Sequence, residues 1–150
     1  MERYRVLSLQ MKAVHALLAI TTIFACSACL AQGHIEANVP EGQQFDTYLQ
    51  RDLDLYFAAN AEQGVTVEYE LLRKTATQVG VAYPKFYAWV KVFKKKVLEQ
   101  QGAVRIAAIE QEGFQITDYV PAEKIRSEPK SIETVFPAAL CPKILELAKP

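Results

Sequence analysis

Residues 45–72, FDTYLQRDLDLYFAANAEQGVTVEYELL, contain a change of hydrophobic period that decides the fold. In the first half, apolar residues recur at intervals of three and four, which predicts an amphipathic helix of about four turns. These apolar positions are Phe45, Tyr48, Leu49, Leu53, Tyr56 and Phe57. Asn60 and Gly64 are typical of a helix end. From Val65 to Leu71 apolar and polar residues alternate, which predicts a half-buried strand.

Three further strands are predicted downstream. Phe86–Phe93 is apolar on nearly both faces, which is typical of a central strand or of one whose second face lines a groove. Ala103–Glu110 and Phe114–Val120 are joined by the short segment Gln111–Gly113, which predicts a hairpin. Strands that follow one another this closely pair antiparallel, because a parallel return needs a long crossover.

The remaining segments are interpreted as connections and short helices. Lys94–Lys96 and Gly102 mark the connection between the second and third strands, and the lysines are interpreted as a solvated turn rather than a grip for an anionic partner. Three helical pieces end the chain, at residues 121–126, 131–136 and 137–148. Pro137 and Pro142 are expected to break them.

These elements predict an α+β fold in which a long N-terminal helix packs on a four-stranded antiparallel sheet, followed by short C-terminal helices. The helix has to bury its apolar stripe, and the sheet is the available partner.

The first thirty-one residues have the pattern of an export signal. Three positive charges, at Arg3, Arg5 and Lys12, precede an almost uncharged apolar run over residues 13–25, and small residues follow. The run is shorter than the roughly 18–20 residues of a membrane-spanning helix, although an uncut signal would still act as an anchor.

The processing of this signal stays open. Translation starts at Met1 or at Met11, and cleavage after Ala31 gives a soluble protein, whereas lipoprotein-type cleavage at Cys26 or Cys29 gives a lipid-anchored one. The expected domains are a signal peptide (1–31), a flexible tether (32–43) and a single α+β domain (44–150). We therefore expect the protein in the periplasm or outside the cell, either soluble or held at the membrane as a lipoprotein.

Residue usage excludes several classes of function. Beyond residue 31, acidic and basic side chains nearly balance, which leaves no electrostatic footprint for nucleic acid or an anionic membrane. His15 and His34 lie in the signal and the tether, which removes Ser–His and Cys–His catalysis and histidine zinc sites from the predicted fold. Cys141, in an apolar segment, is interpreted as a buried small hydrophobe. No P-loop or dinucleotide fingerprint occurs, and neither a cofactor nor a metal is expected.

The densest aromatic stretch supplies the first candidate site. Tyr83, Tyr87, Trp89 and Phe93 would line a ligand groove if they are exposed, because aromatic side chains with a polar handle suit binding surfaces. Aromatic residues are also common in strands and cores, so the same pattern fits a buried sheet face.

Carboxylates supply the second candidate site. Glu68 and Glu70 share one face of their strand, and Asp118 comes from the last strand. If they converge, they form a pair suited to general acid–base chemistry. Alternation places the two glutamates on the polar face, which is also what a solvated sheet displays.

The loop between the first two predicted strands contains Gln78, Val79 and Gly80, followed by Val81 and Ala82. With the order helix, strand, loop, strand over roughly residues 44–120, it resembles the cystatin family of cysteine-protease inhibitors, whose first hairpin loop carries a Gln-x-Val-x-Gly motif. Gly80 is displaced from the family's position, and the 111–113 hairpin lacks the family's Pro-Trp pair. The resemblance implies an inhibitory wedge at Gln78, Val79 and Gly80. Nuclear-transport-factor-like domains, which often enclose a pocket, are similar in element order.

The sequence thus favours a small exported bacterial binding or interaction protein without catalytic activity, whose partner is a protein or small molecule of the cell envelope. The first alternative is an inhibitor of a secreted or periplasmic enzyme, and the second is a carboxylate-dependent enzyme of small substrates. No nucleic-acid partner is expected, and the membrane is reached only through a lipid anchor or an uncleaved signal.

Overall fold

The computed structural model describes residues 38–59, 64–77 and 83–150. Several predictions fall outside this part of the chain: the signal peptide and the start of the tether, the lipidation candidates Cys26 and Cys29, and the loop residues Gln78, Val79 and Gly80.

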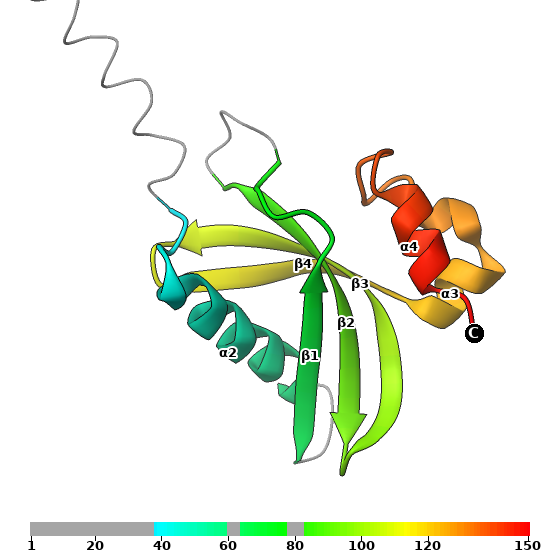
Figure 1. Ribbon diagram of the computed structural model, residues 1–150, viewed down its shortest axis with the longest axis horizontal. Coiled ribbons are helices and arrows are strands. Elements are labelled where there is room, and N and C mark those ends of the chain that lie inside the picture. Colours follow the sequence, from blue (N-terminus) through cyan, green and yellow to red (C-terminus); the bar gives the residue numbers. More distant parts are fainter. Residues whose placement is uncertain (1–37, 60–63, 78–82) are drawn as a thin grey trace, which may run out of the picture. The chain divides into compact units, whose positions relative to one another are not determined.

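A helix is followed by a meander of four strands and then by short helices (Figure 1). The helix and strands are α2 (Gln43–Ala59), β1 (Val65–Leu71), β2 (Lys85–Lys94), β3 (Val97–Glu110) and β4 (Gly113–Pro121). The short helices are α3 (Ala122–Ser127), the 3-10 helix η1 (Pro129–Ile132) and α4 (Cys141–Leu147). Each strand pairs antiparallel with the next, in the order β1-β2-β3-β4, so the α+β class and the four-stranded antiparallel sheet are confirmed.

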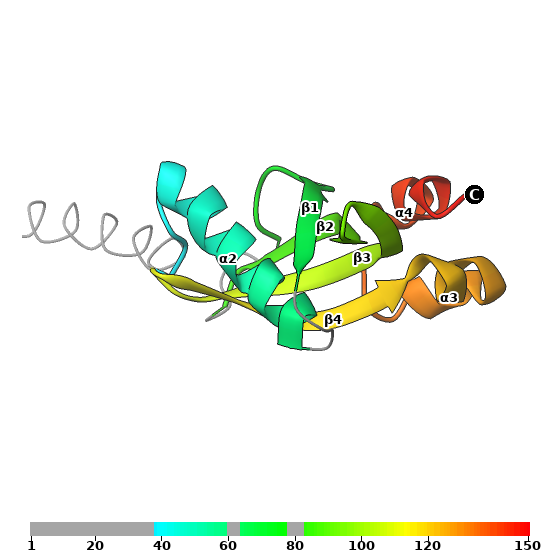
Figure 2. The same ribbon diagram turned by 90° about the horizontal axis from the view of Figure 1, so that it is seen from below.

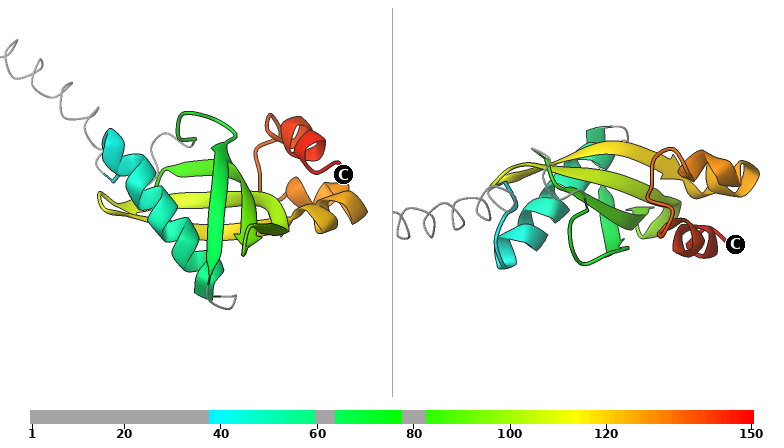
Figure 3. Two further views of the ribbon diagram at one scale, coloured as in Figure 1. Left: turned by 60° about the horizontal axis from the view of Figure 1, so that its bottom comes forward. Right: turned by 90° about the horizontal axis from the view of Figure 1, so that it is seen from above.

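Helix α2 crosses one face of the sheet (Figure 3) and buries its apolar stripe there. Leu49, Leu53 and Phe57 are almost fully buried, and each such side chain contributes about 1.5–3 kcal/mol relative to exposure. Their partners are Val67, Phe86, Ala88, Val90, Val92, Val104, Ile106, Ala108 and Phe114. This cluster is the main core, and it explains why β2 is apolar at every second residue.

Polar side chains of α2 also hold the first edge strand. Asp54 Oδ1 accepts a hydrogen bond from the backbone N–H of Val67 in β1, at 3.1 Å. Gln50 donates to the carbonyl of the same residue, at 2.8 Å. The helix therefore satisfies backbone groups that an edge strand would otherwise present to other chains.

The other edge strand is held in the same way. Asp52 Oδ2 accepts a hydrogen bond from the backbone N–H of Phe114 in β4, at 2.7 Å, and Arg51 donates to the carbonyl of Glu112, at 2.6 Å. Because one helix reaches both edges, the sheet curves around α2.

The C-terminal segment covers part of the second face of the sheet. Trp89 on the sheet forms a second buried cluster with four side chains of this segment, namely Ile125, Ile132, Phe136 and Ile144. Helices α3 and α4 lie together at the end of the sheet where β4 ends (Figure 2). A hydrogen bond from Arg126 to the carbonyl of Ala148, at 2.9 Å, joins them.

The structure corrects two expectations about local signals. Residues before α2 belong partly to the fold and not to a free tether, because Pro40 is buried and Val39 packs against the main core. Pro142 does not break the last helix but stands in its first turn, where the missing N–H costs nothing.

The connection between β2 and β3 is shorter than predicted. Strand β3 begins at Val97, so only Lys95 and Lys96 form the turn. Gly102 lies inside β3 and not in the connection. A Cβ at this glycine would stand 2.4 Å from the carbonyl oxygen of Val120 and 2.9 Å from the Cα of Pro121, so its lack of a side chain permits a close backbone approach.

We predict that Gly102→Ala destabilises the fold by about 2 kcal/mol, because the added methyl group collides with backbone atoms that cannot rotate away. Urea denaturation measures this loss. Gly113→Ala is the matched control: its added Cβ meets nothing closer than 3.9 Å, so its effect should stay within about 0.5 kcal/mol. Equal stability of the two variants would contradict the close approach.

Candidate binding cleft

Three phenylalanines join the start of α2 to the sheet. The ring centroids of Phe45 and Phe86 lie 5.0 Å apart, those of Phe45 and Phe114 also 5.0 Å, and those of Phe86 and Phe114 6.1 Å. All three pairs are edge-to-face, an arrangement that adds attraction beyond area burial. Because the rings come from α2, β2 and β4, they hold one end of the fold together.

An apolar cleft of about 340 Å³ opens beside this cluster. Its lining residues are Val39, Pro40, Glu41, Phe45, Lys74, Thr75, Ala76 and Phe86. One wall of the cleft is formed by residues just before α2, and another by residues just after β1. The volume lies near the lower end of the roughly 300–1,000 Å³ found for ligand pockets, so it has room for one or two apolar side chains.

The surroundings of this cleft are polar and aromatic. Glu41 and Lys74 are exposed lining residues of opposite charge. Tyr83, 49% exposed, belongs to the same connection between β1 and β2, and the ammonium of Lys85 lies 6.0 Å from its ring centroid. An apolar floor with polar surroundings is the usual anatomy of a protein-binding surface.

Three segments lie at the same end of the meander (Figure 1): the residues just before α2, the residues that follow β1, and the Gln111-Glu112 turn. The first two of these segments line the cleft. The hydrogen bond from Arg51 to the carbonyl of Glu112 joins α2 to the third connection.

Of the two alternatives that the sequence left open for Tyr87 and Trp89, the structure shows the buried sheet face and not the exposed groove. Both side chains are only 3% exposed, because the C-terminal segment covers this apolar part of the sheet. The rings of Tyr87 and Phe136 lie 5.9 Å apart, and the Tyr87 hydroxyl accepts a hydrogen bond from Thr77, at 3.1 Å. Phe93 is half-buried near the far end of β2, so the aromatic candidates form no common groove.

The candidate carboxylates do not converge. Glu68 and Glu70 lie on β1 and Asp118 on β4, the two edges of the sheet, on the order of 14 Å apart at the usual strand spacing. Glu70 forms an ion pair with Lys143 at 2.6 Å, and Asp118 forms one with Arg105 at 2.5 Å. The acid–base site that these residues would have formed is therefore not assembled.

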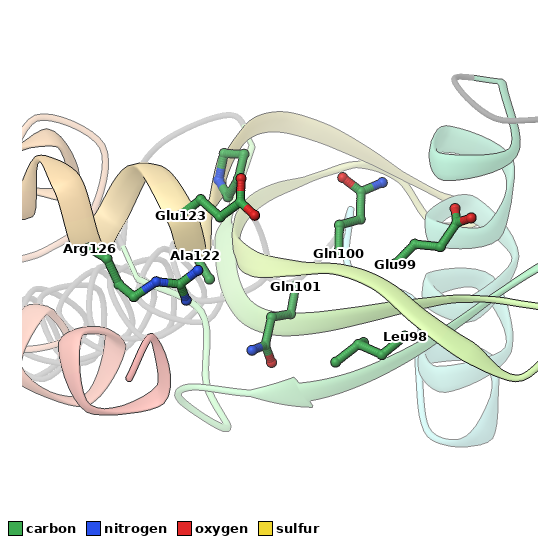
Figure 4. Close-up of a pocket in the computed structure, with 8 residues that line it drawn as sticks. Leu98, Glu99, Gln100, Gln101, Ala122, Glu123 and Arg126 are labelled. Atoms are coloured by element: carbon green, nitrogen blue, oxygen red, sulfur yellow. The ribbon is translucent and has the colours of Figure 1, made fainter. Parts of the chain in front are cut away.

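A second cavity, of about 440 Å³, lies between the start of β3 and α3 (Figure 4). Figure 4 shows Glu123 and Arg126 coming from α3, and Leu98, Glu99, Gln100 and Gln101 coming from β3. Its side chains are mostly exposed and of mixed charge, and the Arg126 guanidinium already donates to the Ala148 carbonyl. This lining favours water over an apolar ligand.

Tyr119 lies close to this second cavity. Its hydroxyl donates to Gln100 at 3.4 Å, and its ring packs on that of Phe57, with centroids 5.0 Å apart. Burial, with smaller contributions from Tyr56 and Glu123, raises the pKa of Tyr119 to about 12. Burial also raises the pKa of Tyr69, and the hydrogen bond from its hydroxyl to Asp46, at 2.8 Å, acts in the same direction.

Cys141 is half-buried at the start of α4 and not fully buried as expected. Its thiol lies 3.6 Å from the carbonyl oxygen of Pro137. Burial raises the pKa of this thiol, with a smaller contribution from Glu133, so the reactive thiolate is scarce at neutral pH.

Comparisons of the chain with models of protein families, with curated proteins and with solved structures find no match. Within residues 38–59, 64–77 and 83–150, no group of three or more His, Cys, Asp or Glu side chains is arranged to hold a metal ion. In the same part of the chain, no helix is both long and apolar enough to span a membrane.

The cleft residues Phe45, Phe86, Lys74 and Ala76 were not predicted from the sequence as a site. The pattern at Phe45 and Phe86 indicated only that both belong to the core, because each lies on the apolar side of its helix or strand. Val39-Pro40, an apolar pair just before the helix, is the one local signal that pointed to this end of the fold.

We predict that the free energy of unfolding falls as the pH rises from about 10 to about 12. The unfolded chain loses the Tyr119 proton near its ordinary pKa of 10, whereas the folded chain holds it to about 12, so alkaline pH favours unfolding. Urea denaturation at stepped pH measures the slope, which Tyr119→Phe should reduce. An unchanged slope in that variant would contradict the assignment.

Proposed function

We propose that this chain is an exported, non-catalytic binding protein of the bacterial cell envelope, which holds an apolar side chain of a partner polypeptide in the cleft beside Phe45 and Phe86. The observation that carries the proposal is this apolar cleft, which is lined by residues just before α2 and just after β1. Both walls of the cleft come from segments that connect elements of the scaffold, where binding residues concentrate.

The dimensions of the cleft favour a polypeptide partner. Its volume suits one or two anchoring side chains, while Glu41 and Lys74 are placed to pair with charges that flank such an anchor. Tyr83 adds an exposed aromatic surface on the same connection.

The distribution of reactive groups supports binding over catalysis. Both histidines of the chain precede the fold, and the candidate carboxylates stand on opposite edges of the sheet in separate ion pairs. The Cys141 thiol has a raised pKa, which disfavours a nucleophile at neutral pH.

We predict that peptides selected from a random library on the purified chain carry an aliphatic or aromatic anchor and bind through the cleft. Thr75→Trp, which places a large ring at the cleft wall, should weaken their binding at least about tenfold, as for other well-packed anchors. Fluorescence anisotropy of labelled peptides measures the affinity, and thermal denaturation verifies that the variant is folded.

Thr66→Trp is the matched control, because Thr66 is an exposed threonine of β1 outside the cleft lining. It should leave the affinity unchanged. Peptides that bind Thr75→Trp as tightly as the parent chain, or a selection that enriches nothing, would contradict the proposal.

An enzyme inhibitor is the second candidate function. The observation that favours it is that the residues just before α2, residues 72–77 and 83–84, and the 111–112 turn lie at one end of the fold. Residues 72–77 and 83–84 flank Gln78, Val79 and Gly80 in the sequence, and the wedge would be formed by these three residues. We predict for this candidate that excess protein inhibits a papain-like protease and that Val79→Asp weakens the inhibition at least about tenfold. Full protease activity at high excess of the protein would reject it.

A further inference from the structure

The turn between β2 and β3 exposes lysines and aliphatic side chains side by side. Residues 95–100 are six consecutive exposed residues at and after this turn. Among them Val97 is 66% and Leu98 44% exposed, which places both among the most exposed large hydrophobic side chains of the described chain. Lys94, Lys95 and Lys96 precede them directly. We call residues 94–98 the basic tip.

The backbone of the basic tip is one that lysine rarely adopts. Lys95 has φ 49° and Lys96 has φ 68°. A two-residue hairpin turn needs positive φ at both positions, and Asn-Gly is the sequence that provides it without strain. Two lysines at these positions cost stability, and strained residues of this kind concentrate at functional sites.

The basic tip is positively charged although the chain as a whole is not. The whole chain has a formal net charge of zero, yet Lys94, Lys95 and Lys96 lie together with Lys91 just before them on β2. Among the described residues, the acidic groups on neighbouring positions are Glu99, in β3, and Glu68, which pairs across the sheet with Lys91. The charge balance of the entire chain therefore conceals a positive end of the hairpin.

We propose that the basic tip docks on an anionic lipid surface. The exposed lysines Lys95 and Lys96 would contact headgroup phosphates, while Val97 and Leu98 enter the boundary between headgroups and acyl chains. This is the combination that holds peripheral proteins at anionic membranes. The turn lies at the opposite end of β2 from the 72–84 connection (Figure 1), so docking in this way directs the cleft away from the bilayer.

The decisive variant is Lys95→Asn with Lys96→Gly in the full chain, because it separates folding from docking. Relief of the strained turn should raise the melting temperature by several degrees, about 4 °C or more. Removal of two lysines should weaken binding to vesicles of phosphatidylglycerol and phosphatidylcholine about 25-fold, since each lysine near an anionic surface contributes about fivefold. Co-sedimentation measures the binding.

Two matched controls test charge and apolar contact separately. Lys124→Gln with Lys130→Gln removes the same charge from exposed positions of the C-terminal segment and should leave binding unchanged. Leu98→Ser should weaken binding, whereas Leu145→Ser, at another exposed leucine, should not. Because residues 13–25 are apolar, binding is scored as the difference between anionic vesicles and pure phosphatidylcholine vesicles.

Hydrogen–deuterium exchange locates the contact. Anionic vesicles should slow exchange over residues 94–99 of the parent chain, and dextran sulfate, a soluble polyanion, should protect them less. Equal binding of the parent and the Lys95→Asn, Lys96→Gly variant, no preference for anionic vesicles, or protection by dextran sulfate alone would each overturn the proposal. The last outcome would assign the basic tip to a soluble acidic partner.

Discussion

The rest of the structure depends on the burial of the apolar stripe of α2 against one face of the sheet. Leu49, Leu53 and Phe57 fill this face, while Asp54 and Asp52 hold the two edge strands through backbone N–H groups. One helix thus supplies both the core and the protection of both edges. It also sets the position of Phe45, and with it the floor of the cleft. The cleft therefore borders the core that this helix buries.

The second face of the sheet is covered by residues from the C-terminal end of the chain. Its aromatic residues Tyr87 and Trp89 are separated by some fifty residues from the C-terminal side chains that cover them, such as Phe136 and Ile144. Their burial completes a second core and removes the broad aromatic face from binding. What remains for recognition is the set of connecting segments at the ends of the strands, where binding residues concentrate.

An antiparallel meander places successive connections at alternating ends, and this gives the molecule two chemically different ends. One end carries the apolar cleft with Glu41 and Lys74 beside it, and the other carries the basic tip at Lys95 and Lys96. The two proposals use different residues and different ends, so each can fail without the other. If both hold, the sheet acts as a spacer that keeps the partner-binding end away from a membrane.

The sequence alone determined the α+β class, the strand at Val65–Leu71 and the antiparallel sheet, because these depend on hydrophobic period and short connections, which are local properties. The sequence could not decide whether Trp89 lines an exposed groove or lies on a covered face. The alternation of residues shows which side of a strand is apolar, but not which segment packs on that side. Nor did the sequence limit the turn to Lys95-Lys96, because its pattern extended the connection from Lys94 to Gly102. Tertiary structure decided both, and it assembled the cleft from Val39, Phe45, Ala76 and Phe86, because contacts between residues distant in sequence form only when the sheet closes around α2.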